Sequence, residues 1–296
     1  MKKDVVVSIM VLVLTFVFSF TALAGGHGED KPIKKGILLV AFGSSVPEAQ
    51  VSFENIDNKV NKTFPGIPVR WAYTSHIIRH KLAKEGKQLD SVEVALAKMM
   101  DEGFTHVAVQ SLHTIAGEEY HQLVQNAHAF GLMAGGFKRI VVGYPLLARE
   151  DDLERVTKAI LGHIPRDRKK KDAVVLMGHG SPHPGNAFYA AMMYHFQRED
   201  PNIFLGTVEG APTIDDIKEM LAEKRIKKAY LMPFMSVAGD HARNDMAGDE
   251  EDSWKSILTK QGVICVPILK GTAEYDDIVN IWVDHLRQVL SHFKDS

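Results

Sequence analysis

The sequence predicts an α/β protein with two similar flavodoxin-like lobes, each a parallel sheet flanked by helices, and a cleft between them. Three observations support this fold class. The chain has 296 residues, roughly twice a common domain size of about 150. One set of sequence patterns occurs twice in the same order, and within each copy short apolar runs alternate with helical patterns.

The composition is that of an ordinary globular protein, with 45% hydrophobic and 24% charged residues. It excludes a disordered chain and a multi-span membrane protein. With 35 basic and 37 acidic side chains, the net charge of −2 gives no basic field that would collect nucleic acid. A single cysteine excludes an internal disulfide and a cysteine-based zinc site. Small-molecule chemistry that uses some of the 14 histidines is therefore favoured.

The first residues have the pattern of an export signal. Lys2 and Lys3 precede an apolar run over 5–20, and Ala22-Leu23-Ala24 supplies the small-x-small site of a signal peptidase. A membrane anchor is the alternative, but the run is short for a span of about 20 residues, and no basic cluster follows it. We predict a signal peptide over 1–24, a periplasmic location and no membrane attachment after cleavage.

The rest of the chain contains an internal duplication. The segment GILLVAFGSS from Gly36 resembles AVVLMGHGSP from Ala173, and both have the pattern of a buried strand ending in a glycine turn. Two further pairs match in order, and FTHVAVQSLHTIAGEEY aligns with IKKAYLMPFMSVAGDHA at an offset of 122 residues. The charged run 166–171 has the composition of a linker. We therefore predict an N-terminal lobe over 25–165 and a C-terminal lobe over 172–296.

Helix starts and faces are visible in several places. Asp90-x-x-Glu93 and Thr213-x-x-Asp216 have the spacing of capping boxes. The last helix has a continuous apolar stripe from Ile278 to Phe293 that predicts core packing, with His285 at its margin.

The loops after the strands differ between the two copies. Phe42 in the first copy corresponds to His179 in the second, and Glu119 corresponds to His241. Glu209 follows another strand of the second copy. Open parallel sheets bind ligands beyond the carboxyl ends of their strands, so these three polar residues are candidates for a site. The alternatives are structural histidines and a solvated loop carboxylate.

At these residues the chain resembles the class II tetrapyrrole chelatases, and most closely the anaerobic-pathway sirohydrochlorin cobaltochelatases. The motifs are AFGSS at 41–45, QSLHTIAGEEY at 110–120, GHGSPHP at 178–184, VEGAPT at 208–213 and PFMSVAGDHARNDMAGD at 233–249. The resemblance implies a bilobal enzyme that inserts Co²⁺ or Fe²⁺ into sirohydrochlorin. It places the two active-site histidines at His179 and His241, with the acidic partner at Glu209. The export signal is a departure from most relatives, which act in the cytoplasm.

These residue types suit the implied reaction. Imidazole binds Co²⁺ and Fe²⁺, and two imidazoles do not form a closed cage that would retain the ion. An ordinary histidine pKa near 6.5 allows a ring to accept a pyrrole proton at neutral pH. Glu209 can balance the metal's charge, orient a histidine or carry protons away. The metal is then a substrate, and no permanently bound cofactor is required.

Further residues are candidates for contact with the tetrapyrrole. Ser44, Ser45 and Ser181 lie at glycine turns that open helices, where hydroxyl and backbone N–H groups can bind carboxylates. Each serine is otherwise a helix cap. His113 follows a strand of the first copy and can face the cleft. For His183, close to His179, a loop role is favoured over a supplementary metal contact.

His121 and His128 lie seven residues apart on one predicted helical face. They are candidates for a second surface site that binds a metal or a haem-like group, against the alternative of two solvated histidines.

Two other functions remain open at this stage. Two α/β lobes behind an export signal also describe a periplasmic protein that binds a tetrapyrrole or a metal without turnover. Within the enzymes, the rival is a ferrochelatase that acts on another porphyrin. The sequence also leaves open whether the chain forms a homo-oligomer.

Overall fold

A computed structural model describes residues 32–293, so the predicted signal peptide lies outside the described residues. From Lys34 onward the chain forms one compact unit. Within the described part, no helix combines the length and the apolar character that crossing a membrane requires.

Two four-stranded parallel sheets form the framework of this unit. The first has the order β2-β1-β3-β4 and the second the order β6-β5-β7-β8. The equal strand orders confirm the predicted pair of similar α/β lobes. The strands are β1 (Lys35–Ala41), β2 (Val69–Tyr73), β3 (His106–Ser111), β4 (Arg139–Gly143), β5 (Ala173–Gly178), β6 (Ile203–Thr207), β7 (Lys228–Pro233) and β8 (Ile264–Pro267).

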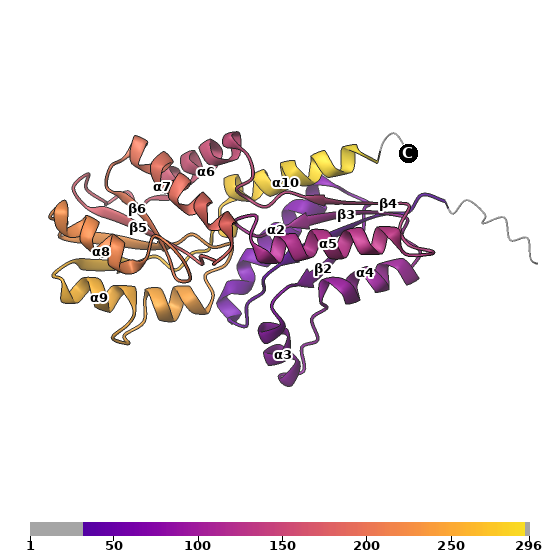
Figure 1. The fold of residues 1–296 in the computed structure, drawn as a ribbon, viewed down its shortest axis with the longest axis horizontal. Helices are drawn as coiled ribbons and strands as arrows, with labels where there is room; N and C mark the ends of the chain where they lie inside the picture. The colour runs from indigo at the N-terminus through magenta and orange to yellow at the C-terminus, as the bar shows by residue number, and fades with distance from the viewer. Residues whose placement is uncertain (1–31, 294–296) are drawn as a thin grey trace, which may run out of the picture. The chain divides into compact units, whose positions relative to one another are not determined.

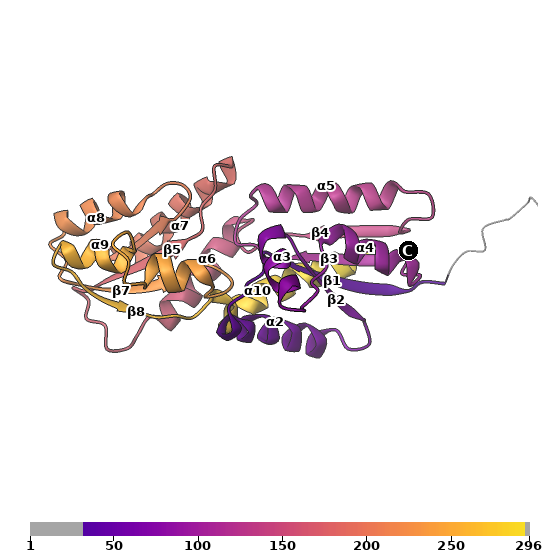
Figure 2. The same cartoon turned by 90° about the horizontal axis from the view of Figure 1, so that it is seen from below.

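Helices connect successive strands and cover the sheets (Figures 1 and 2). The α-helices are α2 (Gln50–Thr63), α3 (His76–Lys84), α4 (Val92–Asp101), α5 (Glu118–Leu132), α6 (Glu150–His163), α7 (Ala187–Glu199), α8 (Ile214–Glu223), α9 (Trp254–Lys260) and α10 (Asp276–Ser291). Four short helical segments are η1 (Pro47–Ala49), η2 (Pro184–Asn186), η3 (Ala242–Met246) and η4 (Thr272–Glu274).

The central strands are buried on both faces, as their apolar sequences predict. Residues Gly36–Ala41 of β1 and all residues of β5 are buried. Both strands end at glycine turns, because Gly43 and Gly180 have φ values of +106° and +82°, which side-chain-bearing residues rarely adopt. These turns fix where the chain leaves each sheet.

The last helix of each repeat packs against elements of the other repeat. α10 contacts β3, β4 and α2 of the first lobe, and α6 contacts α7 of the second lobe (Figures 1 and 2). One apolar cluster accordingly contains residues of both sheets, both helices and α7. The predicted C-terminal lobe over 172–296 includes α10. The helix covers the first sheet instead, because its apolar stripe packs against β3 and β4.

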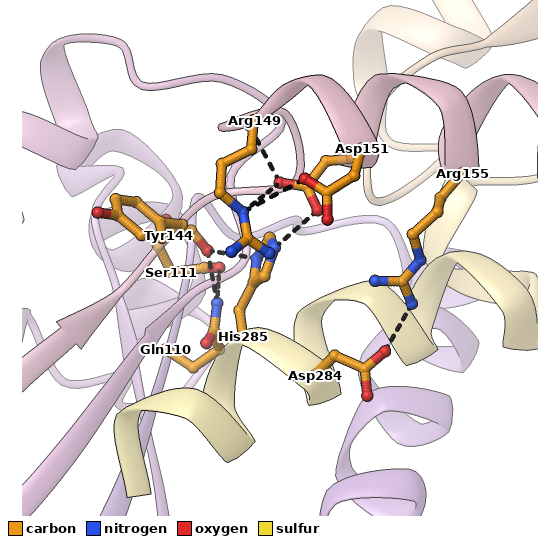
Figure 3. Close-up of polar contacts among 9 residues, drawn as sticks. Gln110, Ser111, Tyr144, Arg149, Asp151, Arg155, Asp284 and His285 are labelled. Carbon is orange, nitrogen blue, oxygen red and sulfur yellow. Dashed lines mark hydrogen bonds and ion pairs between the residues drawn. The ribbon is translucent and has the colours of Figure 1, made fainter. Parts of the chain in front are cut away.

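A buried polar pair joins the two exchanged helices. His285 Nε2 of α10 lies 3.0 Å from Asp152 Oδ1 of α6, and both side chains are fully buried. His285 Nδ1 lies 3.2 Å from the carbonyl oxygen of Tyr144, which also accepts a hydrogen bond from the Gln110 amide (Figure 3). The expectation that His285 lies at the margin of its stripe is therefore wrong. Its ring is buried in the core, where the Asp152 carboxyl group and the Tyr144 carbonyl are hydrogen-bond partners of its two nitrogens.

The two predicted capping boxes have different outcomes. Thr213 and Asp216 form a complete capping box at the start of α8, as predicted. At α4 the cap is Ser91, whose hydroxyl accepts the N–H of Val94, while Asp90 binds Lys98. The expectation for Asp90 is wrong by one residue, because serine and aspartate are both good caps and stand next to each other.

Candidate active site at the strand ends

His179 and His241 lie together beyond the carboxyl ends of the second sheet. His179 follows β5, and His241 immediately precedes η3 in the segment after β7. Their ring centroids are 4.8 Å apart, and the rings are nearly perpendicular at 89°. Their side chains are 28% and 33% exposed, so both imidazoles are supported by protein and reachable by a ligand. The two residues that the sequence singled out thus lie in ring contact.

The hydrogen bonds of both rings leave the same nitrogen available. His179 Nδ1 lies 3.1 Å from the carbonyl oxygen of Gly180, and His241 Nδ1 contacts a carboxylate oxygen of Asp245. Since both partners are acceptors, each Nδ1 carries a proton and donates. In the neutral ring the lone pair is then on Nε2, where it can bind a metal or accept a proton.

Glu209 is held beside His179 by the backbone. The N–H of Glu209 donates to the carbonyl oxygen of His179 at 2.7 Å, and the Glu209 Oε2 atom lies 3.9 Å from His179 Nδ1. A Cβ atom at Gly180 would lie 2.7 Å from the Glu209 backbone carbon, so only glycine permits this close approach. The Glu209 side chain is 57% exposed and can reorient toward a ligand.

Among the described residues, no group of three or more histidine, cysteine, aspartate or glutamate side chains has a geometry that could hold a metal ion. The site consists of two imidazoles in ring contact, with the Asp245 carboxylate beside His241 and the Glu209 carboxylate beside His179. Such an open arrangement leaves positions on a metal for other donors and suits an ion that is passed on.

The first lobe contributes an aromatic wall. The ring of Phe42, at the end of β1, lies 5.6 Å from the ring of His179. A Cβ atom at Gly239 would lie 3.1 Å from Ser44 Oγ, so the two strand-end loops approach closely. The histidine pair therefore faces residues of the other lobe.

His113 of the first lobe is placed to stay neutral. Its Nδ1 lies 2.9 Å from Ser111 Oγ and its Nε2 lies 3.4 Å from Thr74 Oγ1. Burial lowers the pKa of His113 to about 4, and the opposing influence of the Glu119 charge is smaller. His113 is therefore an uncharged hydrogen-bonding group at neutral pH, unlike a solvated histidine.

The predicted serine contacts have local partners. Ser44 Oγ accepts the N–H of Val46, and Ser181 Oγ accepts the N–H of His183. Both hydroxyls thus stabilise the turns that carry them and can still donate a hydrogen bond outward. Ser45 is half-buried in the same loop as Ser44.

The ring of His121 contacts His183 rather than His128. The centroids of His121 and His183 are 4.7 Å apart, whereas His128 lines a separate surface pocket between α5 and β4. His183 Nδ1 accepts the N–H of Gly185 at 3.0 Å, which confirms the loop role favoured for His183. The η2 loop brings His183 to His121, and the second surface site suggested at His121 and His128 stays a prediction.

Two residues of the site were missed by the sequence interpretation. Asp245 fixes the His241 ring from four positions further on, and the His-x-x-x-Asp spacing is the signal that could have identified it. Tyr189 lies beneath the His179 loop, where burial raises the pKa of its hydroxyl, and the N–H groups of Gly180 and His179 approach its oxygen. No local signal in the sequence distinguishes Tyr189 from a core aromatic residue.

Comparison with known proteins shows which family the chain belongs to. The model of the family described as "Cobalt chelatase (CbiK)" matches residues 35–291. The chain belongs to this family.

Two relatives match most of this CbiK family chain. One is the sirohydrochlorin cobaltochelatase CbiKC of Nitratidesulfovibrio vulgaris, 47% identical over 88% of this chain and 93% of the relative. Another is the sirohydrochlorin cobaltochelatase of Salmonella typhimurium, 34% identical over 88% of this chain and 97% of the relative.

Solved structures share the fold at low sequence identity. SirB from Bacillus subtilis with Fe³⁺ is 17% identical, with a TM-score of 0.59, over 89% of this chain and 98% of SirB. CbiX, described as the terminal enzyme for biosynthesis of siroheme in denitrifying bacteria, is 16% identical, with a TM-score of 0.54, over 86% of this chain and 98% of CbiX. The two-lobe α/β fold predicted from the sequence is confirmed.

Proposed function

We propose that this protein is a chelatase that inserts Co²⁺, or alternatively Fe²⁺, into sirohydrochlorin. One metal ion enters the macrocycle and two pyrrole protons leave it. The observation that carries the proposal is the contact between two imidazoles whose Nδ1 atoms face acceptors, so that their Nε2 atoms can bind a ligand, beyond the second sheet of a CbiK family chain. The relatives named above are sirohydrochlorin cobaltochelatases.

The site residues divide the reaction between them. Nε2 of His179 and of His241 hold the incoming metal and replace part of its water shell. As the macrocycle nitrogens take over the metal, the released imidazoles accept the pyrrole protons. Asp245 stabilises the resulting imidazolium of His241, and Glu209 does so for His179. Glu209 is solvated enough to return protons to water.

The first lobe holds the macrocycle in this proposal. Phe42 offers an apolar ring beside His179, and neutral His113 offers a hydrogen bond without repelling a metal ion. The turns that contain Ser44, Ser45 and Ser181 supply hydroxyl and N–H donors for the substrate's carboxylates. The metal is a substrate, so the reaction needs no permanently bound group, and the haem-like group considered at His121 is not part of it.

The test is an anaerobic assay with sirohydrochlorin and, in separate reactions, Co²⁺, Fe²⁺ and Ni²⁺. The absorption spectrum of the macrocycle reports insertion, and we expect Co²⁺ to be inserted faster than in the protein-free reaction. Rates equal to that control for every metal would refute the enzyme assignment. Binding of sirohydrochlorin without turnover would identify a binding protein, and turnover of protoporphyrin in its place would identify a ferrochelatase.

We also propose that the protein acts outside the cytoplasm after removal of residues 1–24. The support is the sequence pattern of two lysines, an apolar run and Ala22-Leu23-Ala24. Mass spectrometry of the protein from its native source should find a mature chain that begins near Gly25. An intact Met1 in that protein would contradict export with cleavage.

A further inference from the structure

Helix α3 carries a pair of histidines outside the site described above. His76 and His80 are four residues apart on α3, both are exposed, and their ring centroids are 6.0 Å apart. Residues at this spacing occupy the same helix face one turn apart. Two histidines at this spacing on one helix face are also an arrangement that chelates transition metals in proteins.

The helix is fixed so that this face points outward. Ser75 caps α3, because its hydroxyl accepts the N–H of Ile78. Leu82 is buried on the opposite side, and the Arg79 guanidinium donates to the carbonyl oxygens of Tyr73 and Thr74. The positions of His76 and His80 are therefore set by a helix that is anchored at its start and on its inner face.

The donor set selects a class of metal. α3 contains no acidic residue, so the pair offers only imidazole nitrogens, which suit Co²⁺, Ni²⁺, Cu²⁺ and Zn²⁺ rather than Mg²⁺ or Ca²⁺. Lys81 and Lys84 on the same helix repel a cation, although solvent screens these exposed charges. Two donors beside positive charges give a weak, rapidly exchanging site, which is unsuitable for a structural metal.

Helix α3 packs against the loop that carries Phe42. The N–H of Ser75, next to His76, donates to the carbonyl oxygen of Phe42 at 3.1 Å. A Cβ atom at Gly43 would lie 3.3 Å from Ile78 of α3, so the helix packs on the loop that carries Phe42. The ring of Phe42 in turn contacts His179. α3 thus adjoins the first-lobe wall of the candidate active site.

We propose that His76 and His80 form a second site for a first-row divalent cation and hold the ion before it reaches the histidine pair at the strand ends. Cation binding at α3 is argued from the geometry of the two histidines. The supply role rests on the proposed chelatase function, so the two parts are tested by separate measurements.

The first measurement is a calorimetric titration of Co²⁺ into the purified protein that carries His179→Ala and His241→Ala. One bound Co²⁺ should remain in this background. Adding His76→Ala and His80→Ala should remove it, because α3 then offers no imidazole nitrogen to the ion. Absence of Co²⁺ binding in the background, or binding unchanged by the α3 substitutions, would overturn the site.

A register variant supplies the matched control. His80→Ala combined with Lys81→His keeps two histidines on α3 but moves the second one off the shared face. This variant should bind Co²⁺ as weakly as the double alanine variant. Co²⁺ binding as strong as that of the protein with His76 and His80 would show that any two histidines on this helix suffice. That result would refute a defined chelate.

The second measurement concerns supply and uses otherwise unsubstituted protein. His76→Ala with His80→Ala should raise KM for Co²⁺ several-fold and leave kcat unchanged, since the reacting groups are untouched. An unchanged KM would refute the supply role while the titration still decides the site. Loss of the proposed function would appear differently, as an absence of turnover in the unsubstituted protein.

Discussion

At the scale of single residues, the surroundings of each imidazole decide what it can do. His179 and His241 are partly exposed and hydrogen-bonded only through Nδ1 in the contacts described, so Nε2 can meet a ligand. His113 is enclosed by two hydroxyls, and burial lowers its pKa. His183 uses its Nδ1 to hold a turn. The same side chain thus serves as a candidate metal ligand, a neutral contact or a turn stabiliser.

Substitution of either histidine of the pair should strongly reduce turnover. His179→Ala or His241→Ala should lower kcat at least about 10²-fold, the usual loss for a proton-transfer group, and should also weaken Co²⁺ binding. The anaerobic insertion assay at saturating Co²⁺ measures this effect. His183→Ala is the matched control, and its rate should stay close to that of the unsubstituted protein. Unchanged rates for both pair variants, with normal folding, would contradict the site assignment.

His113 should make the protein less stable in acid. Its pKa is about 4 in the folded protein and about 6.5 when unfolded, so the unfolded chain binds the proton first as pH falls. The free energy of unfolding should therefore decrease between pH 6.5 and 4, by on the order of 2 kcal/mol from this group. Urea unfolding of the unsubstituted protein and of His113→Gln over this range isolates the contribution. Equal pH dependence in both proteins would show that His113 titrates normally.

At the scale of elements, the exchanged helices α6 and α10 are joined by one buried polar contact. His285 Nε2 and Nδ1 both face oxygen atoms, those of the Asp152 carboxyl group and the Tyr144 carbonyl. Burial by itself raises the pKa of Asp152, but the hydrogen bond and charge of His285 outweigh it and hold that pKa below its usual range. The buried Asp152 carboxyl group is therefore ionised at neutral pH.

Removing one partner of this pair should cost far more than removing a surface pair on the same two helices. His285→Ala leaves the buried Asp152 carboxylate with only its contacts to Arg149, and we expect a loss of about 3 kcal/mol in the free energy of unfolding. Asp284→Asn breaks the half-exposed contact with Arg155, which should cost less than about 1 kcal/mol (Figure 3). Urea denaturation of both variants tests the difference. Similar losses would mean that the buried pair contributes no more than a surface one.

At the scale of the whole molecule, the exchange of α6 and α10 makes each lobe depend on chain from the other repeat. The apolar residues of α10 complete the core over β3 and β4. A fragment that ends at the predicted boundary lacks this cover and would expose a large apolar face.

Residues 34–165 alone should therefore fail to fold cooperatively. Circular dichroism during urea denaturation should show no sharp transition for this fragment, and adding a peptide of residues 275–293 should restore one. A peptide of the same composition in scrambled order is the control. A cooperative transition of the fragment alone would show that the first lobe does not need α10.

The sequence by itself determined the buried central strands, the duplication and the pair of histidines that meet at the strand ends. Apolar runs at 36–41 and 173–178 predict buried strands, and the chain folds them as the central strands β1 and β5. At equivalent loops the first repeat has Phe42 and Glu119 and the second has His179 and His241. This difference identified two histidines that meet in space. These inferences succeeded because a strand or a glycine turn is specified by residues next to each other, and because parallel strands bring their ends to one edge.

Only the tertiary structure decided which surfaces meet. The stripe from Ile278 to Phe293 predicts that α10 is buried, but both sheets present apolar faces of the same kind, so periodicity cannot say which of them it covers. The partner of His285 is 133 residues away in the chain, and the contact of His121 with His183 joins a helix to a loop of the other repeat. Such contacts depend on packing across the whole chain, because the free energy of burying an apolar face does not depend on where in the sequence the covering residues lie.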